Sequence, residues 1–233
     1  MVKSELIKRS PLRILEKSIH GGLGKGNIGV IASRKGVGKT ACLVHIGTDK
    51  LFQEKHVIHV SFSSRTDHII SWYEDIFKEI TKKRELEHAM EVHNTIIKNR
   101  VIMNFNQDGI QTEQVLHSLK AMIKDGNFGA DMVVVDGFDF AKANPEDLQQ
   151  VKNFAKELNI EIWFSVSLPE GSNFDENGTP MLLKDFLGQI SVLVTLKPDN
   201  NHIKLQLVKD HGHVPVEELH LILDSKSLLI VEE

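Results

Sequence analysis

Cysteine, arginine and long apolar runs are all scarce in this chain of 233 residues. The single cysteine, Cys42, cannot form an internal disulfide, which is typical of proteins in a reducing compartment. No run of about 18 apolar residues occurs, so the sequence predicts no membrane-spanning helix. The first residues also lack the apolar core of a signal peptide. We therefore expect a cytoplasmic protein that makes no membrane contact.

Arginine stops early in the chain, since the last one is Arg100. Nucleoside and nucleotide kinases need several arginines in a lid that clamps phosphates, so the sequence disfavours a kinase. The net charge is −4, from 28 Lys and Arg against 32 Asp and Glu, and gives no overall positive field to attract nucleic acid. With 41% hydrophobic and 26% charged residues, the composition is that of an ordinary globular domain.

The most informative segment is SRKGVGKTA at 33–41, directly after the apolar run at 28–32. It follows the phosphate-loop pattern G-x-x-x-x-G-K-[ST], except that Ser33 stands at the first glycine position. In such a loop the backbone N–H groups and the following helix surround phosphate oxygens, Lys39 adds a point charge, and Thr40 offers its hydroxyl to Mg²⁺. We predict a nucleoside triphosphate site formed by Ser33, Arg34, Lys35, Gly36, Val37, Gly38, Lys39, Thr40 and Ala41.

A second segment supplies the carboxylate that such a site needs. Residues 132–136 read MVVVD, a buried strand that ends in an acid. At this place Asp136 would hold Mg²⁺ through a water molecule, next to Thr40. Asp139 is a weaker candidate for the metal shell or for positioning water. It is the only residue that we consider for a catalytic role here, and the sequence supports that role only weakly.

Strand and helix patterns alternate along most of the chain. This alternation predicts an α/β fold with a mainly parallel central sheet flanked by helices. Later strands joined by short turns predict an antiparallel C-terminal extension over about 191–231. We expect one domain, 1–233, in which 1–27 form an N-terminal helix and a glycine-rich lead into the first strand. The expected strands are 28–32, 57–62, 101–105, 131–136, 161–166, 191–196, 203–208 and 218–223, and the expected helices are 12–18, 67–82, 85–98, 113–124, 145–158 and 182–187.

The order of these segments resembles the RecA-like P-loop ATPases, nearest to KaiC-like proteins and the ATPase domain of DnaB-type replicative helicases. The resemblance covers roughly residues 12–223 and implies a RecA-like fold that binds ATP or ADP with Mg²⁺. It rests on GGLGKGN at 21–27, the phosphate loop, the strand at 57–62, the MVVVD strand, IWFSVS at 162–167 and VKDHG at 208–212.

The chain departs from that family at positions that serve hydrolysis. The family's water-polarising glutamate follows the second strand, where this chain has Ser63 and Ser64, and a serine cannot act as that base. The glutamine that reads the γ-phosphate is replaced by VSL at 166–168. The arginine that reaches a neighbouring subunit's nucleotide is replaced by His211, either a weak substitute or an exposed loop histidine. An arginine finger is worth about 10³–10⁵ in rate, so we expect a site that holds ATP and hydrolyses it slowly, if at all.

Three functions stay open at this point. The first is a regulatory or structural ATP-binding module that acts with a protein partner or with further copies of itself. The second is an active oligomeric ATPase of DNA replication, recombination or repair. The third is a nucleic-acid-binding protein, disfavoured because the polar loop at 169–180, a predicted mobile loop, contains acids and no Lys or Arg. ATP is preferred over GTP only by the resemblance. For the active ATPase, the candidate acids are Asp67, Glu74 and Asp139 and the candidate arginines are Arg34, Arg65 and Arg100.

Overall fold

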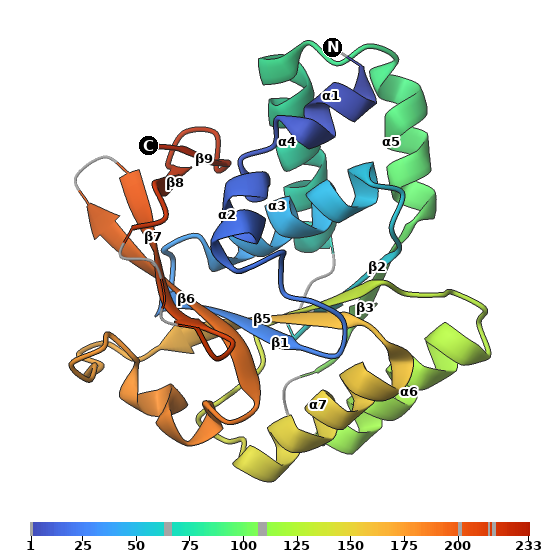
Figure 1. Cartoon of the computed structure of the whole chain (residues 1–233). Coiled ribbons are helices and arrows are strands. Elements are labelled where there is room, and N and C mark those ends of the chain that lie inside the picture. Colours follow the sequence, from blue (N-terminus) through green and yellow to red (C-terminus); the bar gives the residue numbers. More distant parts are fainter. Residues whose placement is uncertain (1, 63–66, 107–110, 200–201, 214, 216–217) are drawn as a thin grey trace.

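The computed structural model describes the chain except for residues 1, 63–66, 107–110, 200–201, 214 and 216–217. Its helices and strands alternate through most of the sequence (Figure 1). The helices are α1 (Lys3–Lys8), α2 (Leu12–Ser18), α3 (Lys39–Phe52), α4 (Asp67–Arg84), α5 (Ala89–Lys98), α6 (Thr112–Lys124) and α7 (Pro145–Leu158), with a short 3₁₀ helix, η1 (Met181–Phe186). The strands are β1 (Ile28–Arg34), β2 (Val57–Ser61), β3 (Arg100–Asn104), β4 (Met132–Asp136), β5 (Glu161–Leu168), β6 (Ile190–Asp199), β7 (His202–Asp210), β8 (Leu221–Asp224) and β9 (Ile230–Glu232).

All nine strands belong to one sheet, in the order β3-β2-β4-β5-β1-β6-β7-β8-β9. The neighbouring pairs from β3 to β6 are parallel, and those from β6 to β9 are antiparallel. The prediction of an α/β fold with a mainly parallel sheet and an antiparallel C-terminal extension is therefore confirmed. Because β1 lies between β5 and β6, it is central, and its first six residues are buried.

Helices cover both faces of the sheet (Figure 1). Helices α1 to α5 lie over one face, and α6 and α7 cover the other. Successive side chains of each strand point to opposite faces of the sheet and so pack against the two helical layers in turn. In β4, Met132 and Val134 pack with the α3 and α4 layer, whereas Val133 and Val135 pack with α6 and α7. Parallel strands that are buried on both faces need this continuous apolar sequence.

Most predicted elements are present with shifted ends. The prediction for α7 is confirmed in detail, because Asn144 Oδ1 accepts from the N–H of Asp147 at 2.9 Å and Pro145 begins the helix. The helix expected from residue 85 begins only at Ala89, since Glu85 and His88 have φ of 47° and 52°, which a helix does not allow. Helix α1 and strand β9 were not predicted. None of the helices in the described ranges has both the length and the apolar composition that a bilayer crossing needs.

Candidate phosphate-binding site

The predicted phosphate loop leads from the carboxyl end of β1 into the amino end of α3. Two glycines make the turn, with φ of +81° at Gly36 and +105° at Gly38. These values lie in the region that favours glycine, which explains the spacing of the two residues in the sequence. The loop therefore directs the start of α3 toward the edge of the sheet where the parallel strands end.

The amino end of α3 carries unused hydrogen-bond donors. Gly38 caps the helix without a side-chain hydrogen bond, and its carbonyl accepts the first helical bond, from Cys42 at 3.0 Å. Among the described residues, the backbone N–H groups of Lys39, Thr40 and Ala41 have no protein acceptor. Such free donors, together with the helix dipole, attract an anion.

Lys39 is only 7% exposed and lies against the same end of the helix. Its Nζ donates to the carbonyl oxygens of Ser33 at 3.1 Å and Arg34 at 2.9 Å. Burial lowers the pKa of Lys39, and the nearby charge of Asp136 opposes this effect. A phosphate group would replace the two carbonyl acceptors with charged ones, which form stronger hydrogen bonds.

Thr40 and Asp136, the two residues to which the sequence assigns Mg²⁺, are in contact. Thr40 Oγ1 donates to Asp136 Oδ2 at 2.9 Å. On β5, between the strands that carry these motifs, Ser165 Oγ donates to Asp136 Oδ1 at 2.5 Å and accepts from the N–H of Gly137 at 3.1 Å. A threonine hydroxyl and a carboxylate are oxygen groups of the kind that Mg²⁺ prefers. The sequence did not single out Ser165 as part of this group.

One side of the loop is closed by the C-terminal strands. A Cβ at Gly38 would lie 2.3 Å from Leu223 Cδ2 and 3.9 Å from Ile203 Cδ1. Leu223 is fully buried, so β8 rests directly on the loop. An anion therefore cannot approach Gly38 from this side.

The remaining predicted contact residues divide into buried and exposed ones. Ser33 and Ala41 are buried, Val37 is half-buried, and Arg34, Lys35 and Gly36 are exposed. Ser33 contributes its carbonyl oxygen to Lys39, so serine at the first glycine position is compatible with this arrangement. Cys42, on the same helix, is fully buried, and burial raises the pKa of its thiol to about 12, which makes it unreactive.

Asp139 has partners of its own. Its Oδ1 accepts from the N–H of Ala141 at 3.1 Å, and its Oδ2 is 3.4 Å from Lys142 Nζ. Of the other acids and arginines considered, Glu74 is 2.6 Å from His93 Nε2 and 3.9 Å from Arg100. The guanidinium of Arg100 lies 4.4 Å from the centre of the Tyr73 ring. Ser63, Ser64 and Arg65 lie outside the described residues.

The late segment, residues 208–212, is held by its own chain. Lys209 Nζ donates to the carbonyl oxygens of Leu187, at 2.5 Å, and Ile190. His211 has φ of +49°, its Nδ1 is 2.7 Å from Asp210 Oδ1, and its Nε2 is 3.0 Å from the carbonyl of Leu23. The interpretation of His211 as an exposed loop histidine is wrong, because these contacts fix the ring and leave its side chain 27% exposed.

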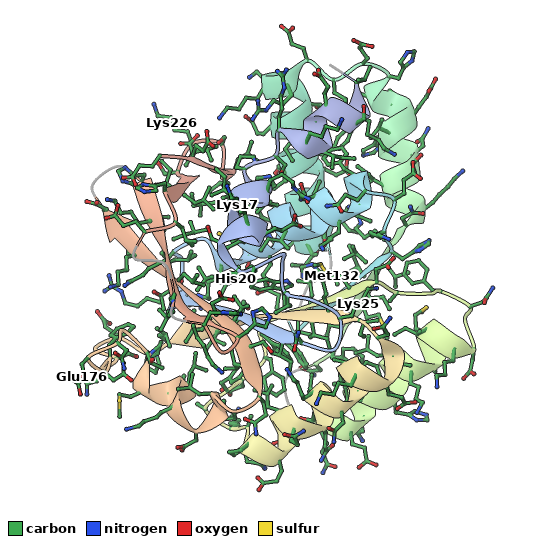
Figure 2. The ribbon with its side chains drawn as sticks, viewed as in Figure 1. Lys17, His20, Lys25, Met132, Glu176 and Lys226 are labelled. Atoms are coloured by element: carbon green, nitrogen blue, oxygen red, sulfur yellow. The ribbon has the colours of Figure 1, made fainter. Side chains whose placement is uncertain are left out.

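His20 contacts both Asp210 and His213 from the other end of the chain, which sequence reasoning missed. His20 Nδ1 is 2.6 Å from Asp210 Oδ2, and the rings of His20 and His213 stack with centroids 3.9 Å apart. His20 lies near the centre of Figure 2. The sequence gives no indication of this contact, because His20 and Asp210 are 190 residues apart. Within the described ranges, no three or more His, Cys, Asp or Glu side chains are arranged to hold a metal ion.

No protein-family model matches the chain, and no curated protein is similar enough to it to count as a relative.

Proposed function

We propose that the chain is an ATP-binding protein of the RecA-like P-loop class, which acts as a regulatory or structural module and hydrolyses ATP slowly. One observation carries this proposal. The buried ammonium of Lys39, the free N–H groups that open α3 and the Thr40–Asp136 pair all lie at one end of β1. This combination provides donors and charge for the phosphates and oxygen groups for Mg²⁺.

The metal part of the proposal rests on the chemistry of the residues. Thr40 would bind Mg²⁺ through its hydroxyl, and Asp136 would hold it through water. Ser165 orients the carboxylate of Asp136 by a 2.5 Å hydrogen bond. When bound, Mg²⁺ would neutralise negative charge on the phosphates.

Slow hydrolysis is supported by the residues that would have to assist the chemistry. Asp139 is engaged by Ala141 and Lys142. Lys209 and His211 are bound by backbone and carboxylate groups of their own chain. To contact a neighbouring molecule's nucleotide, either side chain would first have to lose these hydrogen bonds. An active oligomeric ATPase that used Lys209 or His211 in this way would have to offset the loss.

The proposal is tested by isothermal titration with ATP and with ADP, each with Mg²⁺, beside a phosphate-release assay. We expect ATP binding by the wild-type chain and little release of phosphate. Lys39→Ala removes charge-assisted hydrogen bonds worth about 1.5–3 kcal/mol, so ATP affinity should fall roughly 10- to 100-fold. Asp136→Asn should weaken ATP binding in Mg²⁺ but not in EDTA.

The matched control is Lys226→Ala, because Lys226 is an exposed lysine on the turn between β8 and β9 (Figure 2). Its ATP affinity should equal that of the wild type. Binding of ATP that is unaffected by Lys39→Ala would contradict the proposed site. Rapid phosphate release that depends on Lys39 and on protein concentration would favour the active oligomeric ATPase instead.

A further inference from the structure

A cavity of about 320 Å³ opens at the carboxyl ends of β1, β5 and β6. Its wall includes Ala32 and Leu168, which belong to the core on the α6 and α7 side of the sheet. Part of the loop after β5 forms another wall, and Glu176 marks this loop at the lower left of Figure 2. Lys39, Thr40 and Asp136 do not line the cavity, but Ser33, Arg34 and Val37 do, so it adjoins the candidate phosphate site and shares part of its loop.

The loop over this cavity is held by hydrogen bonds. Ser172 Oγ donates to the carbonyl of Pro169 at 2.7 Å, and Asp175 Oδ1 accepts from the N–H of Thr179 at 2.8 Å. Phe174 forms a β-bridge with Pro180. These contacts hold the loop to itself beside the cavity.

The interior of the cavity is mainly apolar. Val37, Leu168, Phe174 and Leu196 supply apolar surface. Thr195 also lines the cavity, but it is only 2% exposed and its Oγ1 is buried, so the hydroxyl is not counted among the groups that a ligand would contact.

Two cations line the same cavity. Arg34 and Lys197 are exposed, and neither has a carboxylate within ion-pair distance in the described part of the chain. None of the lining residues is acidic. Two other cavities of similar volume, about 330 and 340 Å³, differ, because each has three acidic residues in its lining; the second shares Lys197 with this one. The uncompensated positive charge favours an anionic ligand here.

We propose that this cavity is a binding site for a small organic anion with an apolar body. The apolar part would lie against Leu168, Phe174 and Leu196, and the anionic group would interact with Arg34 and Lys197. Because Ser33, Arg34 and Val37 line the cavity and also belong to the phosphate loop, its occupant would contact that loop.

The test uses the fluorescent sulfonate 8-anilinonaphthalene-1-sulfonate as the probe, titrated into the intact chain without nucleotide. We expect saturable binding to one site. Lys197→Gln should weaken it about three- to tenfold, by loss of the charge. Lys226→Gln removes the same charge from a distant exposed position and should leave the affinity unchanged.

Two results would overturn the proposal. The first is equal probe affinity in the wild type and Lys197→Gln, both shown to be folded by circular dichroism. The second is displacement of the probe by ATP with Mg²⁺ in the wild type but not in Lys39→Ala, because the cavity would then belong to the nucleotide site. Probe binding that persists in a chain that fails to bind ATP would support the anion site and contradict only the proposed function.

Discussion

The phosphate loop and the late segment carry lysines whose surroundings differ in one decisive respect. Lys39 and Lys209 both donate to two backbone carbonyl oxygens. Around Lys39 there are also free N–H groups and a carboxylate–hydroxyl pair that a phosphate and a metal ion could use. Around Lys209 and His211 the polar groups are already bound to one another. A lysine motif therefore indicates a ligand site only where neighbouring polar groups remain available to bind a ligand.

The largest expected effect comes from Gly38→Ala, which tests how closely the phosphate loop is packed. Alanine would be strained at φ of +105° and would collide with Leu223, 2.3 Å from its Cβ. We expect a loss of roughly 2–5 kcal/mol in the free energy of unfolding, the sum of a left-handed backbone cost and overpacking. Urea denaturation measures this loss.

Gly36→Ala is the matched control for that variant. Gly36 has φ of +81° but open space around its Cβ position, so only the backbone cost of about 1–2 kcal/mol should remain. Adding Leu223→Ala to Gly38→Ala should cost less than the two changes summed, because they share one contact. Equal losses for the two glycines would show that Leu223 does not restrict the loop.

A pH effect of about 3 kcal/mol is expected from His45, on the helix that the phosphate loop begins. The buried Nδ1 of His45 accepts from the N–H of Ile230 at 2.9 Å. Burial, followed by the charge of Lys83, lowers its pKa from 6.5 to about 4. The unfolded chain therefore binds the proton more readily between these values. This stability is complete above pH 6.5 and is lost as the pH falls toward 4.

Urea denaturation at pH 7 and pH 5 measures about 2 kcal/mol of that effect, with His45→Gln as the comparison. His59 is also buried, and its pKa is also lowered to about 4, so a residual pH dependence should remain in the variant. A variant with the full wild-type slope would show that His45 does not contribute.

A smaller effect is expected in the late segment from Asp210→Asn. Asp210 is buried, and its two carboxylate oxygens contact the rings of His20 and His211. The side-chain amide of asparagine has only one oxygen that can accept a hydrogen bond, so one of the two contacts would be lost. We expect a loss of about 1–3 kcal/mol in the free energy of unfolding. ATP affinity, measured by titration, should not change. A parallel loss of ATP affinity would mean that the two regions are coupled.

The smallest effect is expected from Lys209→Met, which keeps the length of the side chain and removes its charge. Two backbone carbonyls would lose a donor, at a cost of about 1–2 kcal/mol. The rate of phosphate release should stay at the wild-type level, because Lys209 is already bound within its own chain. A decrease in that rate at high protein concentration would instead assign Lys209 to a neighbouring molecule's nucleotide.

The sequence predicted the phosphate-loop region better than the late segment for physical reasons. Gly38, Lys39 and Thr40 lie next to one another, and the parallel sheet brings the end of β4 to the same edge, so Asp136 could be placed from its strand pattern. The partners of Lys209 are backbone carbonyls. Every residue has one, so the residue types in the sequence do not indicate which carbonyls will be bound. The meeting of His20 with Asp210 depends on tertiary packing. Strand β9 was missed because three residues carry too little periodicity.

The position of β1 has a consequence for how the chain is made. Ile28 pairs with Ile162 and with Ile190, so both sheet neighbours of this apolar strand come from much later in the sequence. At 5–20 residues per second, a ribosome needs roughly 7–27 seconds to supply the first of them. The central strand of the sheet can therefore pair only after most of the chain has been made.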